Sequence, residues 1–171
     1  MRIIKALKVF DDLKKKGVIR DYAVGGAVAM TYYVEPRATR DVDIFLLADY
    51  EEHKLTWDIL DKLGYKYKEG IVIEDIPVDI VPSFQHPFYS EAIRKSKKVR
   101  MDNILVKIFT PEYLIATKLL VFRGKDRIDI FDLFRYVKVN LPKLETILHG
   151  GFKGEAGLLL KRLHKILEEE D

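Results

Sequence analysis

The 171-residue sequence contains no cysteine, and this absence excludes several classes of protein. Without cysteine the chain cannot form a disulfide framework, a thiolate zinc site or an iron–sulfur cluster, and it cannot use a thiol as a nucleophile. The histidines at positions 53, 86, 149 and 164 include no close pair of the kind that a zinc enzyme uses. Chemistry based on thiols or on a histidine-bound zinc is therefore not expected.

Long apolar runs and amide side chains are also scarce. No run reaches about 18 apolar residues, and the first residues lack the apolar core of a signal peptide, so we expect a soluble cytoplasmic protein. Gln occurs once and Asn twice while 33% of residues are charged, which is typical of proteins from thermophiles. The net charge of +3 is a sum of 30 basic and 27 acidic residues and does not itself indicate a partner.

The hydrophobic pattern changes near residue 110. Up to that point, strand-like and helix-like segments alternate, whereas the remainder is helical only. Strands are expected at 22–24, 41–47, 65–68, 71–74, 77–81, 98–101 and 104–109. Helices are expected at 3–16, 27–33, 50–63 and 88–96, from Thr110-Pro111 onward, over about 127–139, from Pro142, and at 158–169. The prediction is an α+β (α/β) fold with a core over residues 1–109 and a helical subdomain over 110–171.

Two aspartates, Asp41 and Asp43, lie two residues apart in a predicted strand. Because side chains alternate along a strand, both carboxylates project from one face about 7 Å apart. Two ionised carboxylates repel each other, and such a pair normally needs a cation; hard oxygen ligands favour Mg²⁺ or Mn²⁺. The alternative is an ordinary edge strand with solvent-facing acids.

Gly25-Gly26 lies between a predicted strand and a predicted helix. Glycine allows backbone N–H groups to approach an anion, and the start of a helix supplies partial positive charge to phosphate oxygens. The alternative is a tight strand-to-helix turn with no ligand. The segment is neither a Walker P-loop nor a dinucleotide-binding fingerprint, because the other residues of those motifs are missing.

Asp79 is a single acid in the predicted strand Pro77-Val78-Asp79-Ile80-Val81. An acid among Val and Ile is costly unless it has a partner or faces an open surface. If this strand lies beside 41–47, Asp79 completes a three-carboxylate cluster that could bind two divalent ions. Asp79 could then also act as general base toward an acceptor hydroxyl.

These elements, in this order, resemble the polymerase-β-type nucleotidyltransferase superfamily. The segment from Arg37 to Ile44 is similar to the R-x-T-x-D-h-D-h motif (h, apolar) of the AbiEii-type abortive-infection nucleotidyltransferases, many of which are toxins. Lys118-Leu119 and the segment Arg123–Asp129 are similar to the helical motifs of that group. The resemblance extends from about Val24 to Leu133, and it departs from many toxin relatives in having Gly-Gly where they have Gly-Ser.

The resemblance implies a nucleotidyltransferase-like mixed sheet and a metal-dependent transfer of a nucleoside monophosphate from an NTP to a hydroxyl acceptor. The acceptor would be tRNA or other RNA, a protein, or a small molecule such as an aminoglycoside, and a toxin would have an antitoxin partner. Mg²⁺ or Mn²⁺ would be held by the catalytic residues Asp41, Asp43 and Asp79. The nucleotide would be bound by Gly25, Gly26, Arg37, Thr39, Lys118 and Arg123.

Other interpretations of these residues remain open. Lys118 could be a solvated helix lysine, and Arg123 could form structural pairs with Asp126 and Asp129 at three-residue spacing. The basic run from Arg94 to Arg100 could be a solvated surface or a contact to RNA phosphates. At the level of the whole protein, the alternatives are a non-catalytic nucleotide- or partner-binding member of the same fold and a metal-dependent phosphohydrolase.

Overall fold

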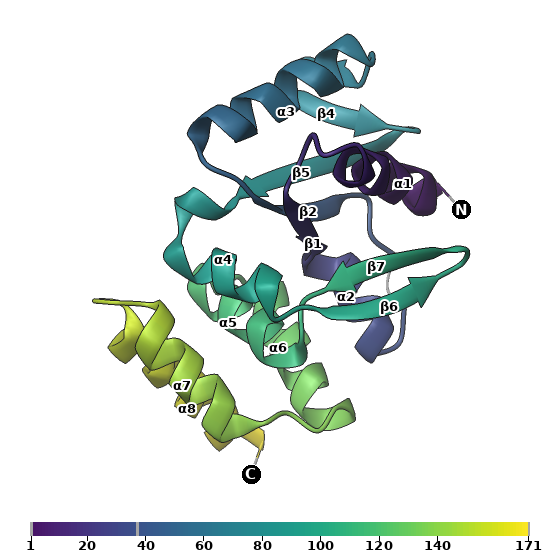
Figure 1. Cartoon of the computed structure of the whole chain (residues 1–171). Helices are drawn as coiled ribbons and strands as arrows, with labels where there is room; N and C mark the ends of the chain where they lie inside the picture. Colours follow the sequence, from purple (N-terminus) through teal and green to yellow (C-terminus); the bar gives the residue numbers. More distant parts are fainter. Residues whose placement is uncertain (1, 37, 171) are drawn as a thin grey trace. The chain divides into compact units, whose positions relative to one another are not determined.

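The computed structural model describes residues 2–36 and 38–170, and it divides the chain into two compact units (Figure 1). Unit 1 consists of the described residues of Met1–Ala29 and Arg37–Phe109, and unit 2 of those of Met30–Pro36 and Thr110–Asp171. Unit 1 contains the sheet with its covering helices, whereas unit 2 is helical. Each unit is described by itself.

A mixed seven-stranded sheet, in the order β3-β4-β5-β2-β1-β7-β6, forms the centre of unit 1. The strands are β1 Asp21–Val24, β2 Val42–Leu47, β3 Lys66–Tyr67, β4 Gly70–Ile73, β5 Ile76–Pro82, β6 Lys97–Met101 and β7 Ile104–Ile108. Strands β2 and β5 run parallel, as do β1 and β7, and the other neighbours are antiparallel. The predicted combination of a mixed sheet with helices is confirmed.

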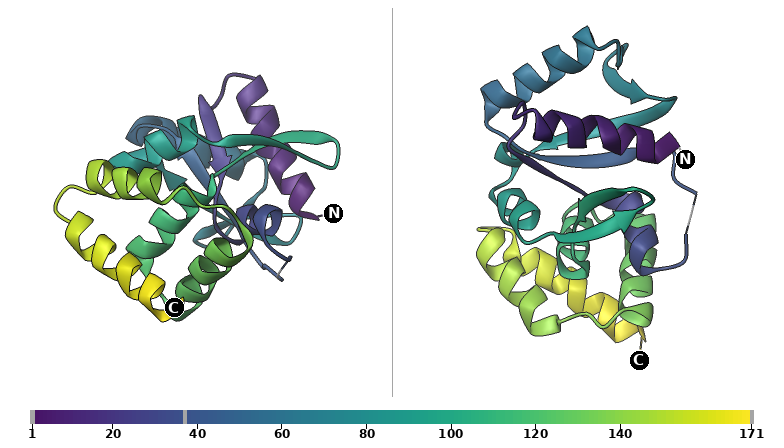
Figure 2. Two further views of the ribbon diagram at one scale, coloured as in Figure 1. Left: turned by 90° about the horizontal axis from the view of Figure 1, so that it is seen from below. Right: turned by 45° about the vertical axis from the view of Figure 1, so that its right-hand side comes forward.

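The helices of unit 1 form where apolar spacing and capping residues predict them. Helix α1 (Arg2–Lys15) buries one face against the sheet, contacts β5 and β7, and ends before Gly17, whose φ is +71° (Figure 2). Helix α3 (Tyr50–Lys62) begins with a capping box in which Asp49 and Glu52 satisfy each other's backbone N–H. The 3₁₀ turn η1 (Ser83–Gln85) and helix α4 (Pro87–Arg94) follow β5.

Unit 2 is built around helix α5 (Pro111–Val121), which packs against α6 (Gly124–Tyr136), α7 (Leu141–Gly151) and α8 (Ala156–Glu170). Thr110 occupies the N-cap position of α5 as predicted, but its hydroxyl donates to the Glu112 carboxylate instead of accepting from a backbone amide. Glu112 in turn accepts the backbone N–H of Asn140 at 3.1 Å. The start of α5 is thereby tied to the start of α7.

The predicted boundaries lie within two residues of the observed ones, except for one helix that is displaced by three residues. The helix expected at 127–139 extends over Gly124–Tyr136, because Asp126 accepts the backbone N–H of Arg123 and caps the helix earlier. The strand expected from Asp41 begins at Val42. Helix α2 (Gly26–Tyr33) begins in unit 1 and continues into unit 2.

Within residues 2–36 and 38–170, every helix is too short or too polar to cross a membrane.

Candidate functional site

Two of the predicted acids lie at the same level of adjacent parallel strands. Strands β2 and β5 pair in a register that places Asp43 directly opposite Asp79, with Val42 opposite Val78. Residues paired in this way project from the same face of a sheet, and neighbouring strands are about 4.8 Å apart. Val42 and Val78 are buried beneath the other face. The strand that contains Asp79 therefore lies beside the strand that contains Asp43, which was the condition for a cluster of carboxylates.

The Asp43 carboxylate lies against Gly26, the first residue of α2. A Cβ atom added to Gly26 would be only 1.7 Å from Asp43 Oδ2, and Gly26 has a φ of +53°. Glycine is therefore needed here both for the backbone conformation and for the approach of the carboxylate. The start of α2 carries partial positive charge, which stabilises a nearby anion.

Gly25 is held to the same strand by a different contact. Its N–H donates to the Asp43 carbonyl at 3.1 Å, and a Cβ on Gly25 would lie 2.4 Å from the Phe45 ring. Close packing of β2 thus provides a structural reason for both glycines. The role of both glycines in phosphate binding stays a prediction.

Asp41 and Thr39 form a small hydrogen-bonded turn just before β2. The Thr39 hydroxyl lies 3.1 Å from both the carbonyl oxygen and the Oδ1 atom of Asp41. Asp41 and Asp79 are exposed, and Asp43 is half-buried. Arg37, the other predicted nucleotide contact in this segment, lies outside the described residues. Thr39 therefore contacts the predicted metal ligand Asp41 directly.

The donor atoms at this edge of β2 and β5 suit a hard divalent cation by chemical type, because they are carboxylate oxygens. The backbone register also suits a shared cation between Asp43 and Asp79. Within the described part of the chain, however, no three His, Cys, Asp or Glu side chains are gathered closely enough to hold a metal ion. The residues thus fit a metal in chemistry and strand placement, and their side chains are not gathered around a single point.

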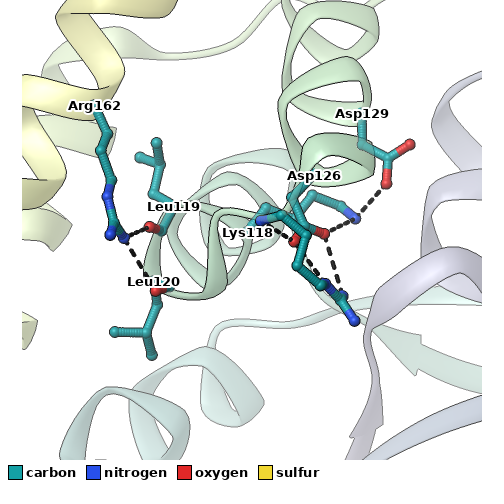
Figure 3. Close-up of polar contacts among 7 residues, drawn as sticks. Lys118, Leu119, Leu120, Asp126, Asp129 and Arg162 are labelled. Carbon is teal, nitrogen blue, oxygen red and sulfur yellow. Dashed lines mark hydrogen bonds and ion pairs between the residues drawn. The ribbon is translucent and has the colours of Figure 1, made fainter.

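In unit 2, Lys118 and Arg123 are held by two aspartates of α6 (Figure 3). Lys118 Nζ lies 2.6 Å from Asp129 Oδ2 and 3.7 Å from Asp126 Oδ1. Arg123 Nε lies 2.9 Å from Asp126 Oδ2, which is the pairing expected from their three-residue spacing. Lys118 is only 8% exposed, so it is not a solvated helix lysine.

Asp126 is the most deeply buried carboxylate of this network, at 1% exposure. Burial alone would raise the pKa of Asp126, but hydrogen bonds from the Arg123 side chain and backbone, with the charges of Lys118 and Arg123, hold it below its ordinary value. Two positive and two negative charges balance within the network. Lys118 and Arg123 are thus already compensated by neighbours in their own unit.

Sequence reasoning missed the contact between Lys118 and Asp129. The two residues are eleven positions apart, and α5 and α6 are separated by Phe122 and Arg123, of which Phe122 adopts a left-handed conformation with φ +55°. This reversal of direction brings the side chains together. The only signal in the sequence was a buried-type helix pattern around Lys118, which implies that its charge needs a partner.

The basic run is exposed along an edge of unit 1. Arg94 is the last residue of α4, and Lys97, Lys98 and Arg100 lie on the edge strand β6. All four side chains are exposed, as either a solvated surface or a phosphate-binding surface requires.

Comparison with known proteins identifies the fold but not a family. No protein-family model matches the chain, and no curated protein matches it. Among solved structures, a nucleotidyltransferase-like antigenic protein from Paracoccidioides brasiliensis is similar at 18% identity and a TM-score of 0.59, with 92% of each chain covered. The solution structure of the antibiotic-resistance factor ANT(2'')-Ia matches at 14% identity and a TM-score of 0.58, covering 96% of this chain and all of that one.

A crystal structure of ANT(2'')-Ia in complex with adenylyl-2''-tobramycin also matches, at 13% identity and a TM-score of 0.54, covering 94% of this chain and 96% of the other. At such low identities the similarity shows a shared fold. The expected nucleotidyltransferase-like architecture is therefore confirmed. The narrower resemblance to AbiEii-type proteins stays a prediction from the sequence motif.

Proposed function

We propose that this protein is a metal-dependent nucleotidyltransferase, which transfers a nucleoside monophosphate from an NTP to a hydroxyl acceptor. The observation that carries the proposal is the parallel pairing of β2 with β5, which sets Asp43 beside Asp79 on one face of the sheet. The nucleotidyltransferase-like fold supports it. In this proposal residues 1–109 are the catalytic core and residues 110–171 the helical subdomain.

The proposed roles of the acids follow from their positions. Asp41, Asp43 and Asp79 would hold Mg²⁺ or Mn²⁺, which, when bound, neutralises charge on the phosphates and on the attacking and leaving oxygens. Asp79, on the exposed part of β5, would accept the proton of the acceptor hydroxyl as its oxygen bonds to the α-phosphorus. The bond from that phosphorus to the bridging oxygen breaks, and pyrophosphate leaves. Catalysis would depend on positioning and charge.

The proposed nucleotide contacts are of two kinds. The Gly25-Gly26 turn at the start of α2 would bind phosphate oxygens, together with Arg37 and Thr39. Because the Gly25 N–H donates to the Asp43 carbonyl, Gly25 would contribute through the shape of the turn and Gly26 through its N–H. Lys118 and Arg123 would bind triphosphate oxygens, in competition with Asp126 and Asp129, which engage them here. Because of this competition, the proposed roles of Lys118 and Arg123 have less structural support than those of Asp43 and Asp79.

The acceptor is proposed only as a class. A small molecule with hydroxyl groups is the first acceptor to test, because one structure of similar fold, ANT(2'')-Ia, is a complex with an adenylylated aminoglycoside. A tRNA end or other RNA and a protein hydroxyl are the other acceptors. Membership of a toxin–antitoxin pair, with an antitoxin as partner, rests on the AbiEii-like motif alone.

Transfer is tested with NTPs labelled on the α-phosphate, incubated with Mg²⁺ and with an aminoglycoside, total tRNA or a protein extract in separate reactions. We expect label on one acceptor together with release of pyrophosphate, and we expect both to be lost in the variant Asp41→Ala/Asp43→Ala. Release of labelled nucleotide to water without an acceptor product would indicate a phosphohydrolase instead.

A non-catalytic member of the same fold is the second candidate. It is favoured by the balanced network around Lys118 and by the carboxylates, which are not gathered into one cluster in the described chain. Such a protein would bind Mg²⁺–NTP or a partner protein without turnover. Binding of NTP in the absence of any label transfer or pyrophosphate release would select this candidate over the enzyme.

A further inference from the structure

A cavity of about 310 Å³ lies in unit 1 between α1, β1 and the β6–β7 hairpin. It is lined by Asp11, Lys14, Lys15, Tyr22, Lys98, Leu105 and Lys107. None of these residues belongs to the proposed catalytic or nucleotide-binding set. Its volume is at the lower end of the range for small-ligand sites, about 300–1,000 Å³.

Positive charge exceeds negative charge around this cavity. Lys14 and Lys107 both donate to the carboxylate of Asp21, and Lys15 pairs with Asp11 at 2.6 Å. Burial alone would raise the pKa of Asp21, but its hydrogen bonds from Lys107 and Lys14 hold it below its ordinary value, so it remains ionised. Four lysines line the cavity, and three aspartates, Asp11, Asp12 and Asp21, act on them, which leaves a local charge of about +1.

Lys98 is the uncompensated member of this group. It has no ion-pair partner among residues 2–36 and 38–170 and lies directly opposite Lys107 in the antiparallel β6–β7 ladder. Like charges opposite each other on a sheet are destabilising. Lys107 is largely buried, with a side-chain exposure of 14%, so the repulsion is only partly screened by water. Lys107 is compensated by Asp21, so Lys98 is the charge that an anion in the cavity would neutralise.

The remaining wall of the cavity is apolar and aromatic. Leu105 contributes an aliphatic surface, and Tyr22 contributes a ring that packs against Phe10. Burial, with the nearby charges of Asp11 and Asp21, raises the pKa of Tyr22, so its phenol stays neutral beside an anion. The cavity therefore combines a cationic side with an apolar side.

We infer that this cavity is a binding site for the phosphate group of a small phosphomonoester, separate from the catalytic site proposed above. A phosphomonoester carries a charge of about −1.5 to −2 at neutral pH, and the excess of lysine over aspartate around the cavity attracts such an anion. Lysine binds phosphate as a point charge, and Lys98 presents such a charge directly opposite Lys107, which already donates to Asp21. Tyr22 and Leu105 face the organic part of the ligand.

The inference is tested by titration calorimetry on the whole chain. EDTA is present, so that metal-dependent binding at Asp41, Asp43 and Asp79 does not contribute. The probes are inorganic phosphate, glycerol phosphate and a nucleoside 5'-monophosphate at constant ionic strength. We expect saturable binding that weakens about tenfold in Lys98→Gln, the effect of losing one charge-assisted contact. Tighter binding of the esters would identify an organic phosphate as ligand, and equal affinities would identify free phosphate.

Lys97→Gln is the matched control, because Lys97 is an exposed lysine of the same strand that precedes Lys98, so its side chain projects from the opposite face of the sheet and does not line the cavity. It should bind the probes like the wild type. The inference is overturned if no probe binds saturably, or if both variants lose affinity equally. A short RNA strand is titrated as a further probe. The inference is also overturned if only this RNA binds, with equal losses in both variants, because the surface would then serve nucleic acid. None of these results depends on nucleotidyl transfer.

Discussion

Gly26 is the residue on which the geometry of the proposed site depends most directly. Its positive φ and the absence of a side chain allow the Asp43 carboxylate to lie at the start of α2. Gly17 has a similarly positive φ of +71°, but a Cβ there would meet nothing within 4 Å. Substitution of each glycine by alanine therefore separates two free-energy costs, that of the backbone conformation and that of a collision with Asp43.

Gly26→Ala is predicted to lower stability more than Gly17→Ala. A left-handed conformation costs a non-glycine residue about 1–2 kcal/mol, and this cost should apply to both variants. Only Gly26→Ala must also displace the Asp43 side chain. The measurement is the free energy of unfolding in urea for both variants, and equal losses would mean that Asp43 moves aside without cost.

Lys118→Met is predicted to destabilise the protein by about 3 kcal/mol, because removal of one partner from a buried ion-pair network leaves uncompensated charge. Asp129 and Asp126 would both lose their contact to Lys118. Lys125→Met, an exposed lysine of the adjacent helix, should change stability little. Urea unfolding of the two variants makes the comparison, and similar stabilities would show that Lys118 has no structural role.

At the scale of the element, charged side chains of other helices contact both ends of helix α5. Lys143 of α7 contacts its start, and Arg162 of α8 contacts its end. At its end, the Arg162 guanidinium donates to the carbonyls of Leu119 at 2.6 Å and Leu120 at 3.1 Å (Figure 3). These carbonyls have no partner within an ideal helix end. Arg162 also lies over the Phe122 ring, at 4.7 Å from its centroid.

Replacement of Arg162 by Gln is expected to lower the free energy of unfolding by about 2 kcal/mol, the range for hydrogen bonds made by a charged group. Lys161→Gln removes the same charge from the preceding, exposed position of α8. The Gln at 161 should leave the urea midpoint nearly unchanged. An equal effect of both substitutions would attribute the loss to net charge and not to the end of α5.

The start of α5 predicts a dependence of stability on pH. Burial alone would raise the pKa of Glu112, but hydrogen bonds from Asn140, its own backbone and Thr110, together with the Lys143 charge, hold it below its ordinary value of 4.5. A carboxyl whose pKa is lower in the folded state stabilises the fold above its unfolded pKa. That stabilisation is lost as pH falls below 4.5 toward the folded pKa.

Urea midpoints at about pH 7 and about pH 3 should therefore differ less in Glu112→Gln than in the wild type. Glu168→Gln, at an exposed position of α8, is the control and should retain the wild-type pH dependence. Identical pH dependence in Glu112→Gln and the wild type would show that Glu112 does not contribute to it.

At the scale of the whole molecule, the sequence predicts local structure well and non-local contacts poorly. Apolar spacing located α1, and Asp49 located the start of α3, because these signals act over a few neighbouring residues. The pairing of β2 with β5 joins strands more than thirty residues apart, so it could be stated only as a condition. The charge balance of the cavity is equally non-local, since its lysines come from α1 and from the β6–β7 hairpin.

The candidate site was predicted residue by residue because its motif is compact. Asp41, Asp43 and the two glycines occupy short segments in which strand alternation and turn preferences apply. The close approach of Gly26 to Asp43 could not be predicted, since it depends on how α2 leaves the sheet. The opposite positions of Lys98 and Lys107 follow from a hairpin formed by the strands expected at 98–101 and 104–109, but their place at a cavity does not.

The central claim is that Asp43 and Asp79, paired across β2 and β5, together bind the divalent ion of a nucleotidyl-transfer site. The most direct measurement is Mn²⁺ binding, followed by electron paramagnetic resonance in the presence of an NTP. Loss of an outer-shell partner alone costs a metal site roughly tenfold in affinity, so Asp43→Asn and Asp79→Asn should each weaken Mn²⁺ binding by at least that factor. Asp102→Asn, at the exposed β6–β7 turn, should bind as the wild type does. Equal Mn²⁺ affinity in all four proteins, or no binding by the wild type, would contradict the claim.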